Sequence, residues 1–208
     1  DNSFKVNFHG VRGSIPSPLT PEEVEEKLLR ACQKAQPEDL ADESSIKDFV
    51  KSLPNEIRGT FGGNSSCVSV EVNGELLIFD AGSGIRMLGQ SLMGREFGRG
   101  QGNAHLFFSH THWDHIAGLP FFCPAYGEGN EINVWAGHLL PESNIEAVLR
   151  QAMTEPLFPV PLDVLRAEIS FHDFMGGEVF DLGDGIAVRT AVLNHPNGAT
   201  GYRVEFGG

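Results

Sequence analysis

Apolar and polar residues alternate in several short segments, and this period of two is typical of strands with one buried face. The segment "SFKVNFHG" near the N-terminus shows it, and "CVSVEV" and "ELLIFD" show it on either side of Asn73 and Gly74. An Asn-Gly pair between two such segments favours a tight β-hairpin, so we expect one there. Further strands are predicted for residues 103–109, 130–137, 167–174, 185–195 and 200–208.

Residues 19–56 have a different character, with the spacing and the end signals of helices. In "TPEEVEEKLLRACQKA", Thr20 is placed to cap the helix, Pro21 takes the first helical position, and acidic residues follow in the first turn. "DESSIKDFVKSL" predicts a second short helix that ends before Pro54. We interpret residues 19–56 as a helical insertion between two strands, serving as a solvated flap, a lid or a dimer contact.

Two more helices are predicted later in the chain, from "GIRMLGQSLM" and from "PESNIEAVLRQAM", which Pro141 is expected to open. Strands come first and are then mixed with helices. This order favours an α/β or α+β fold, in which helices cover sheets, over an all-β sandwich. A chain of 208 residues suits one domain spanning residues 1–208, with the insertion inside it.

Composition narrows the partners that the chain can bind. The formal net charge is -13, which opposes nonspecific binding to nucleic acid or to an anionic membrane, although the composition leaves room for a local basic patch.

The three cysteines, Cys32, Cys67 and Cys123, are far apart in the sequence, which favours reduced thiols in a cytoplasmic protein. No run of about 18 apolar residues occurs, so no membrane span is expected.

The segment "HTHWDH" gathers four potential metal ligands directly after a predicted buried strand. His110 and His112 are two positions apart, so at a strand end their side chains point to the same side, and Asp114 and His115 follow in the turn. Nitrogen and carboxylate donors without thiolate suit Zn²⁺, Mn²⁺ or iron better than Ca²⁺ or Mg²⁺. The isolated histidines are expected to be structural; these are His9, His105, His138 and His172.

One loop cannot complete a metal site, so a ligand from elsewhere is needed. His195 is the candidate, because it follows the predicted strand "IAVRTAV" and precedes Pro196 in a rigid turn. It therefore also stands at the end of a strand, where folds of this class collect functional groups.

The motif "HTHWDH" resembles the HxHxDH signature of the metallo-β-lactamase superfamily. "FHGVRGSIPSP", "RGTFGGNSSCVSVEVNGELLIFDAGSG" and "LNHPNGATGYRVE" resemble segments of its ribonuclease Z-like and phosphodiesterase-like branch. The resemblance implies an αββα four-layer sandwich, with helices outside two facing sheets and two divalent metal ions, most simply zinc, at one edge. Manganese and iron are the alternatives.

Carried over by position, His110, His112 and His195 would bind the first metal, and Asp114 and His115 the second. The resemblance also makes Asp80, at the end of "LLIFD", the residue that orients the ligand loop. The family pattern continues with a bridging aspartate and a final histidine. Neither is found before Gly208 in the expected order, so we expect the C-terminal part of the fold to be missing from this sequence, which leaves the second site incomplete and this fragment with reduced activity or none.

The function that these residues predict is metal-dependent hydrolysis, with a metal-activated water attacking a small phosphodiester such as a cyclic nucleotide. Asp114 would orient the nucleophile and carry a proton. Arg12 and Asn64 are candidates for phosphate contact, or else serve turn hydrogen bonds. The run "LPFFCPAY" would line a wall for an apolar group of the substrate, or else pack in the core.

Three alternatives stay open on the same scaffold. One is a non-catalytic di-iron oxygen or redox sensor, which would use the same first-site histidines. The second is a thioester or lactam hydrolase. The third is an RNA-processing nuclease, which the net charge of -13 disfavours. The small-molecule substrate is the expected partner, and a homodimer is left open.

Overall fold

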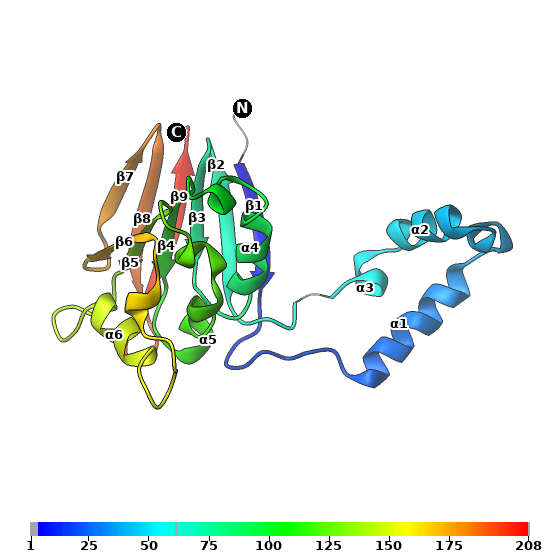
Figure 1. Ribbon diagram of the computed structural model, residues 1–208, viewed down its shortest axis with the longest axis horizontal. Helices are drawn as coiled ribbons and strands as arrows, with labels where there is room; N and C mark the ends of the chain where they lie inside the picture. Colours follow the sequence, from blue (N-terminus) through cyan, green and yellow to red (C-terminus); the bar gives the residue numbers. More distant parts are fainter. Residues whose placement is uncertain (1–3, 61, 208) are drawn as a thin grey trace. The chain divides into compact units, whose positions relative to one another are not determined.

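The chain forms two compact units, which we call the body and the arm. The computed structural model describes residues 4–60 and 62–207. The body comprises Asp1–Pro16 together with Asn64–Gly208, and the arm comprises Ser17–Gly63. Figure 1 shows both sheets in the body together with helices, and further helices in the arm.

The body is built on a six-stranded mixed sheet in the order β1-β2-β3-β4-β5-β6. The first three strands pair antiparallel, and β3 to β6 pair parallel. Because parallel strands end at the same edge of a sheet, the loops after β3 and β4 emerge side by side. The strands are β1 (Phe4–Gly10), β2 (Cys67–Val72), β3 (Glu75–Phe79), β4 (Asn103–Phe108), β5 (Glu131–Ala136) and β6 (Glu168–Asp173).

A second, three-stranded antiparallel sheet faces the first. It consists of β7 (Val179–Gly183), β8 (Ile186–Leu193) and β9 (Ala199–Phe206). Val70, Leu77 and Phe107 of the large sheet form one buried cluster with Ile186 and Val188 of β8. Each such side chain contributes roughly 1.5–3 kcal/mol when it is fully removed from water, so this layer holds the two sheets together.

Helices cover the other face of the six-stranded sheet. They are α4 (Ile85–Leu92), α5 (Trp113–Ile116) and α6 (Ile145–Ala152). Ile85, Leu106 and Ile145 are fully buried in the layer between these helices and the sheet. On the outer side of β8, Arg189 and Ala191 are exposed. The described residues therefore supply the helix, sheet and sheet layers of the predicted sandwich, and the mixed α/β class is confirmed.

The local predictions are mostly confirmed. Asn73 and Gly74 connect β2 and β3, and both have positive φ (47° and 90°), as a tight hairpin turn requires. Pro141 was the wrong start for the later helix, because α6 begins at Ile145. Asn144 caps it instead, with its side-chain oxygen accepting from the Ala147 amide at 2.9 Å. The strand β7 was not predicted from the sequence.

The arm consists of helices connected by short turns. Its helices are α1 (Pro21–Lys34), α2 (Glu43–Ser52) and α3 (Asn55–Arg58), with a single 3-10 turn at Pro37–Leu40. The predicted cap is present: the Thr20 hydroxyl accepts from the Glu23 amide, and the Glu23 carboxylate accepts from the Thr20 amide. The residues 19–56 predicted as an insertion lie within this unit.

Within residues 4–60 and 62–207, no helix is both long and apolar enough to cross a bilayer. Cys32, Cys67 and Cys123 are all free thiols.

Candidate metal centre

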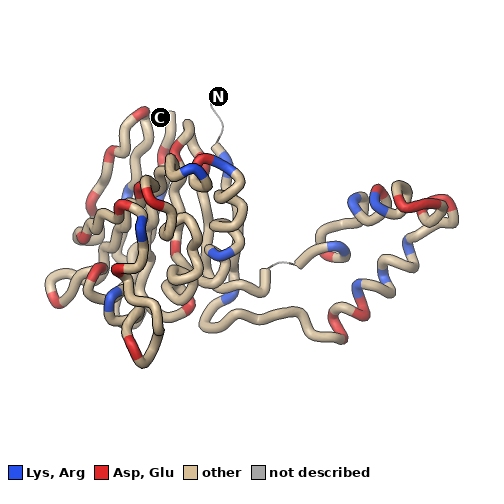
Figure 2. Tube along the Cα trace, viewed as in Figure 1, with Lys and Arg blue, Asp and Glu red and all other residues tan. Residues whose placement is uncertain are grey.

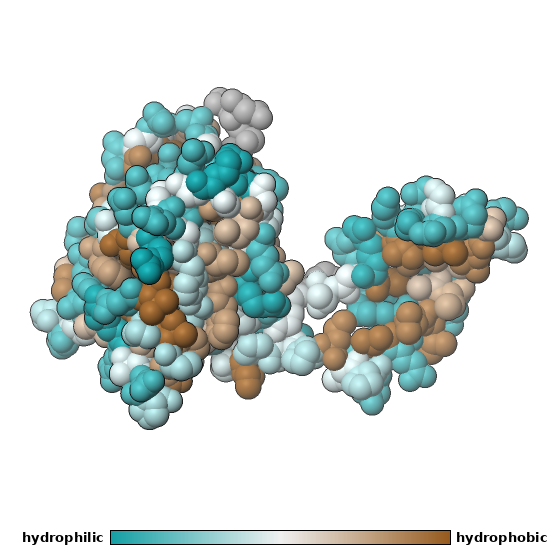
Figure 3. Space-filling view, in the orientation of Figure 1, coloured by the Kyte–Doolittle hydropathy of each residue, from teal (hydrophilic) through white to brown (hydrophobic). Residues whose placement is uncertain are grey.

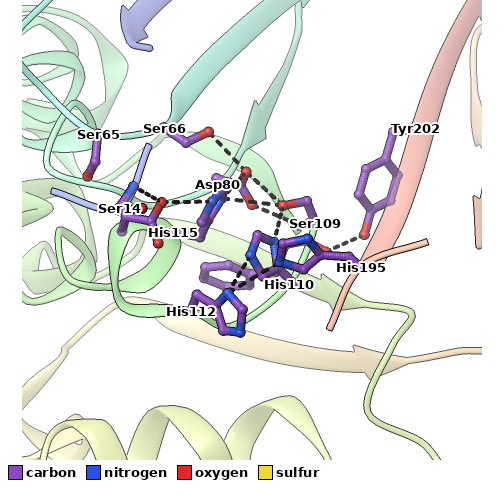
Figure 4. A network of polar contacts seen from close by, with 12 residues as sticks. Ser14, Ser65, Ser66, Asp80, Ser109, His110, His112, His115, His195 and Tyr202 are labelled. Carbon is purple, nitrogen blue, oxygen red and sulfur yellow. Dashed lines mark hydrogen bonds and ion pairs between the residues drawn. The ribbon is translucent and has the colours of Figure 1, made fainter. Parts of the chain in front are cut away.

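The predicted ligands meet where three strands end. Asp80 follows β3, the segment from Ser109 to His112 follows β4, and His195 follows β8. Figure 4 shows side chains from these three places pointing toward one another. A hydrogen bond from the Thr200 amide to the Ser109 carbonyl (2.7 Å) ties the three-stranded sheet to the loop after β4.

His110, His112 and His195 form one compact cluster. The His110 Nε2 atom lies 3.1 Å from His112 Nδ1, and His195 Nε2 lies 3.3 Å from the same atom. One donor atom from each of the three rings lies within 4.8 Å of the other two. The same-side placement of His110 and His112 and the approach of His195 are thus as the sequence predicted.

This donor set fits a divalent metal. Three imidazole nitrogens with an open fourth position are the arrangement that catalytic zinc sites use. Burial lowers the pKa of His110 to about 4, and the neighbouring His115, His112 and His195 act in the same direction. The neutral ring keeps a free lone pair, which is the form that binds a cation.

His195 is held by a turn rather than by a strand. Its carbonyl accepts from the Gly198 amide at 2.9 Å. Pro196 fixes the second position of this turn, and Asn197 and Gly198 take positive φ (65° and 80°). The turn fixes the backbone next to the histidine, so the ring reaches the other two from a rigid base.

Asp80 is the centre of a hydrogen-bond network around the ligand loop. Its Oδ1 accepts from the Ser109 amide at 2.8 Å, and its Oδ2 lies 2.7 Å from His115 Nδ1. The hydroxyls of Ser109 and Ser66 also donate to Oδ2, at 2.9 and 3.1 Å. Asp80 is buried and has φ of 64°, a left-handed backbone conformation that aspartate adopts more readily than most residues with a side chain.

The Ser109 hydroxyl connects this network to His110, because the Ser109 Oγ atom lies 3.0 Å from His110 Nδ1. A ring whose Nδ1 is hydrogen-bonded presents Nε2 to the metal. Asp80 therefore has the geometry of the orienting residue that the resemblance implied.

Asp114 and His115 lie on α5, beside the three-histidine cluster. His115 Nε2 is 3.2 Å from Asp114 Oδ2, and the same oxygen accepts from the Ser14 amide at 2.7 Å. Burial lowers the pKa of His115, but Asp80 and Asp114 outweigh it and the pKa is raised. Burial raises the pKa of Asp114, but the Ser14 amide and His115 outweigh it and the pKa is lowered.

Of the ligands expected for a second metal, Asp114 and His115 are the two that the sequence prediction named. In residues 4–60 and 62–207, the three-histidine cluster is the one group of three or more ligand side chains that converges on a point. His115 contacts both Asp114 and Asp80, and within those residues this pair is not part of any converging group of three ligand side chains.

Two glycines allow the ligand helix to approach the loop after β3. A Cβ at Gly82 would lie 2.3 Å from the Asp114 carbonyl oxygen, and one at Gly118 would lie 2.0 Å from the Gly82 carbonyl oxygen. The Ala81 amide donates to the His115 carbonyl at 2.7 Å across the same contact. Side chains at these glycines would push α5 and its two candidate ligands away.

The isolated histidines have structural partners. His9 lies 2.8 Å from the Ser69 hydroxyl, and His172 lies 3.0 Å from the Asn133 side chain. His105 accepts from the Trp135 indole at 3.1 Å. His138 is different, because its Nε2 lies 3.2 Å from the hydroxyl of Thr111, which stands between two candidate ligands.

Sequence reasoning missed several supporting residues. Ser109 and Ser14 contact Asp80 or Asp114 directly, and the Tyr202 hydroxyl donates to the Phe108 carbonyl at 2.7 Å. Ser109 directly precedes the motif, and that position was a usable signal. Nothing local marks Ser14 or Tyr202, because both meet the site through distant parts of the chain.

Arg12 and Asn64 are neighbours on the loops near this edge. The Arg12 amide donates to the Asn64 carbonyl at 3.0 Å, and the Asn64 side chain accepts from the Ser83 hydroxyl at 3.0 Å. Arg12 is exposed. The bonds at Asn64 are those of a structured turn, and phosphate contact by either residue stays a prediction.

An apolar cavity of about 250 Å³ adjoins the other side of α5. Trp113, Ile116 and Ala117 line it from the ligand segment, and Phe121 and Phe158 line it from neighbouring loops. The run "LPFFCPAY" is divided: Phe122 is buried in the core, whereas Phe121 is 53% exposed at the cavity.

Curated proteins with similar sequences are ribonucleases by name. "Ribonuclease Z" of Halorubrum lacusprofundi is 28% identical over 142 residues, covering 67% of this chain and 41% of the relative. "Ribonuclease Z" of Lactobacillus johnsonii is 30% identical over 149 residues, covering 68% of this chain and 43% of the relative. The chain thus spans less than half the length of these relatives.

A solved structure, "Crystal Structure of a New Diphosphatase from the PhnP Family", matches with a TM-score of 0.52 and 17% identity, covering 97% of this chain and 62% of that chain. At this identity the likeness concerns the fold. The family model described as "Metallo-beta-lactamase superfamily" matches residues 60–206, a range that contains Asp80, the HTHWDH turn and His195. Fold, ligand cluster and family match agree, and the chain belongs to the metallo-β-lactamase superfamily.

Proposed function

We propose that the protein is a metal-dependent hydrolase that cleaves a small phosphodiester. The observation that carries this proposal is the cluster of His110, His112 and His195, whose donor atoms lie within 4.8 Å of one another. Asp114 lies on the adjoining helix with a pKa below its usual value. A metal-binding cluster beside an ionised carboxylate has the parts that water activation requires.

The three histidines would hold the first cation. When bound, a divalent cation supplies Lewis acidity, which activates water near neutral pH and offsets negative charge on the attacked group. Asp114 accepts the proton of the nucleophilic water and orients it, while the Ser14 amide fixes the carboxylate. Asp80 holds His115 and the Ser109 loop in place throughout.

We infer two zinc ions for the complete protein, with Asp114 and His115 contributing to the second. Imidazole and carboxylate ligands also suit manganese and iron, so metal analysis decides among them. Iron together with a visible absorption band, and no hydrolysis, would favour a di-iron sensor instead.

Phosphorus is the favoured electrophile because the relatives are named as a ribonuclease and, among solved structures, a diphosphatase. Long RNA is disfavoured, because the net charge is -13 and the arm carries ten acidic against six basic residues. The apolar cavity beside α5 supports a substrate with an aromatic group, such as a nucleobase or an aryl ester.

Hydrolysis tests this proposal directly. The purified full-length protein is loaded with zinc, manganese or iron and assayed on an aryl phosphodiester, cyclic nucleotides, a precursor tRNA and a glutathione thioester. We expect metal-dependent cleavage of the first two classes. His110→Ala should abolish it, and His172→Asn, which changes a histidine outside the cluster, should not. Cleavage of the tRNA or the thioester alone would overturn the substrate assignment, and no cleavage with any metal would overturn the hydrolase.

A further inference from the structure

The arm presents apolar side chains that nothing within it covers. No residue of α1 or α2 is buried. Val24 and Leu28 of α1 are 43% and 62% exposed, and Ile46 and Val50 of α2 are 41% and 46% exposed. Val24 and Leu28 are one turn apart, as are Ile46 and Val50, so each helix carries an apolar stripe.

Val24, Leu28 and Val50 from these stripes line a common groove of about 430 Å³ between α1 and the segment containing α2 and α3. Leu19, Val24 and Leu28 form one wall, and Val50, Leu53 and Ile57 form the other. Figure 3 shows hydrophobic residues gathered where α1 faces the segment that contains α2 and α3.

Helices of this length need a packing partner. α1 has 14 residues and α2 has 10, lengths at which isolated helices are marginal in water. Most helical stability in proteins comes from burial of an amphipathic face, which is what these two helices lack within the arm. The groove is therefore a surface to be covered.

The charges of α1 indicate what covers it. Its N-terminal half is acidic, and its C-terminal half is basic (Figure 2). The acidic residues are Glu22, Glu23, Glu25 and Glu26, and the basic residues are Lys27, Arg30 and Lys34. Two copies of α1 that run antiparallel place the acidic half of each opposite the basic half of the other. A two-fold axis produces this arrangement, because it brings the same patch of both copies together.

We propose that the arm is a homodimerisation element, in which the grooves of two copies pack against each other with their α1 helices antiparallel. The apolar stripes form the buried centre of the contact, and the opposite charges fix the direction of the helices. A nucleic acid is a poor occupant, because the groove is apolar and the arm is acidic overall. The inference concerns association and is independent of the reaction at the metal centre.

Sedimentation equilibrium over a range of protein concentrations tests the proposal, with no activity required. We expect a dimer for the unaltered chain and a rise of roughly tenfold or more in its dissociation constant for Leu28→Glu and for Val50→Glu. Leu29→Glu is the matched control, because Leu29 is 56% exposed on the same helix but does not line the groove. Circular dichroism of each variant at a concentration where the unaltered chain is dimeric shows whether the body stays folded.

Charge variants at positions of α1 that do not line the groove test the direction of the helices separately. Glu25→Lys with Glu26→Lys makes α1 mainly basic, and Arg30→Glu with Lys34→Glu makes it mainly acidic. Each double variant alone should associate less tightly than the unaltered chain, and an equal mixture should form a heterodimer. A monomer at every concentration would overturn the proposal, as would a dimer that Leu28→Glu and Leu29→Glu affect equally. Double variants that associate as tightly as the unaltered chain would overturn the antiparallel arrangement.

Discussion

The Asp80 carboxylate lies 2.7 Å from His115 Nδ1, so the end of β3 holds a side chain of the turn that follows β4. The two residues are 35 positions apart, and the parallel pairing of β3 with β4 brings them together. The same carboxylate accepts from the amide and the hydroxyl of Ser109. One buried side chain thus fixes the loop that carries four candidate ligands.

Replacing Asp80 should therefore weaken metal binding without removing a ligand. Asp80→Asn keeps the shape but loses the negative charge, and its amide nitrogen cannot accept a hydrogen bond. We expect metal affinity to fall by roughly 10–100-fold, the range found for residues that orient ligands. Titration with a competing chelator measures the change. Asp184→Asn, in the exposed turn before β8, serves as the control, and equal affinities for the two variants would contradict the role of Asp80.

His195 should contribute strongly to metal affinity although its side chain is exposed. Its Nε2 atom is 3.3 Å from His112 Nδ1, and it is the ligand that the loop after β4 cannot supply. His195→Ala should lower metal affinity at least as much as Asp80→Asn, and it should leave the unfolding temperature of the metal-free protein nearly unchanged. Thermal unfolding with and without metal separates the two effects. A metal-induced rise in melting temperature that equals that of the unaltered chain would exclude His195 as a ligand.

The sequence predicted the convergence of the three histidines where the information is local. His110 and His112 are two positions apart, and side chains with that spacing at a strand end point to the same side. Pro196 marks the turn that holds His195. Ser14 and Tyr202 could not be found this way, because their contacts depend on how remote strands align. The pairing of β3 with β4 is parallel and has no turn signal of its own, which explains why the sheet order was also beyond prediction.

The elements that were misjudged have equally physical reasons. Pro141 is acceptable at the first position of a helix, but the Asn144 side chain and Asp173 together cap the chain at Ile145. The strand β7 is five residues long and lies between glycines, so its alternation was too short to distinguish from a loop. In both cases contacts or pairing outside the segment decided the outcome.

A tight backbone contact at Gly82 should limit substitution there. The Cβ of Gly82→Ala would lie 2.3 Å from the Asp114 carbonyl oxygen and 2.6 Å from the Ser66 carbonyl oxygen, so backbone must shift. We expect a loss of roughly 1–3 kcal/mol in the free energy of unfolding, together with weaker metal binding. Gly94→Ala is the control, because its added carbon meets only one atom, at 3.5 Å. Urea unfolding curves for both variants give the comparison, and equal stabilities would show that the loop adapts.

The stability of the body should fall as the pH drops below about 6.5, and His105 is one cause. Burial lowers its pKa in the folded state, and the nearby His172 lowers it further. Burial also lowers the pKa of His172, although Asp173 opposes this. A histidine whose pKa is lower when folded binds more protons when unfolded. Its contribution to stability is therefore present above the unfolded pKa and is lost as the pH falls.

Protonation also removes the acceptor for the Trp135 indole, which donates to His105 Nδ1 at 3.1 Å. His105→Asn keeps an acceptor oxygen but cannot take up a proton. Between pH 7.5 and pH 5.5, the melting temperature of the unaltered chain should fall further than that of this variant, because the variant lacks the contribution of His105 and keeps those of the other histidines whose pKa is lowered by folding. Scanning calorimetry at the two pH values, with metal removed, gives both differences. The variant lacks the group that takes up a proton but keeps the hydrogen-bond acceptor. Equal falls in melting temperature for the two proteins would therefore show that protonation of His105 does not destabilise the fold in acid.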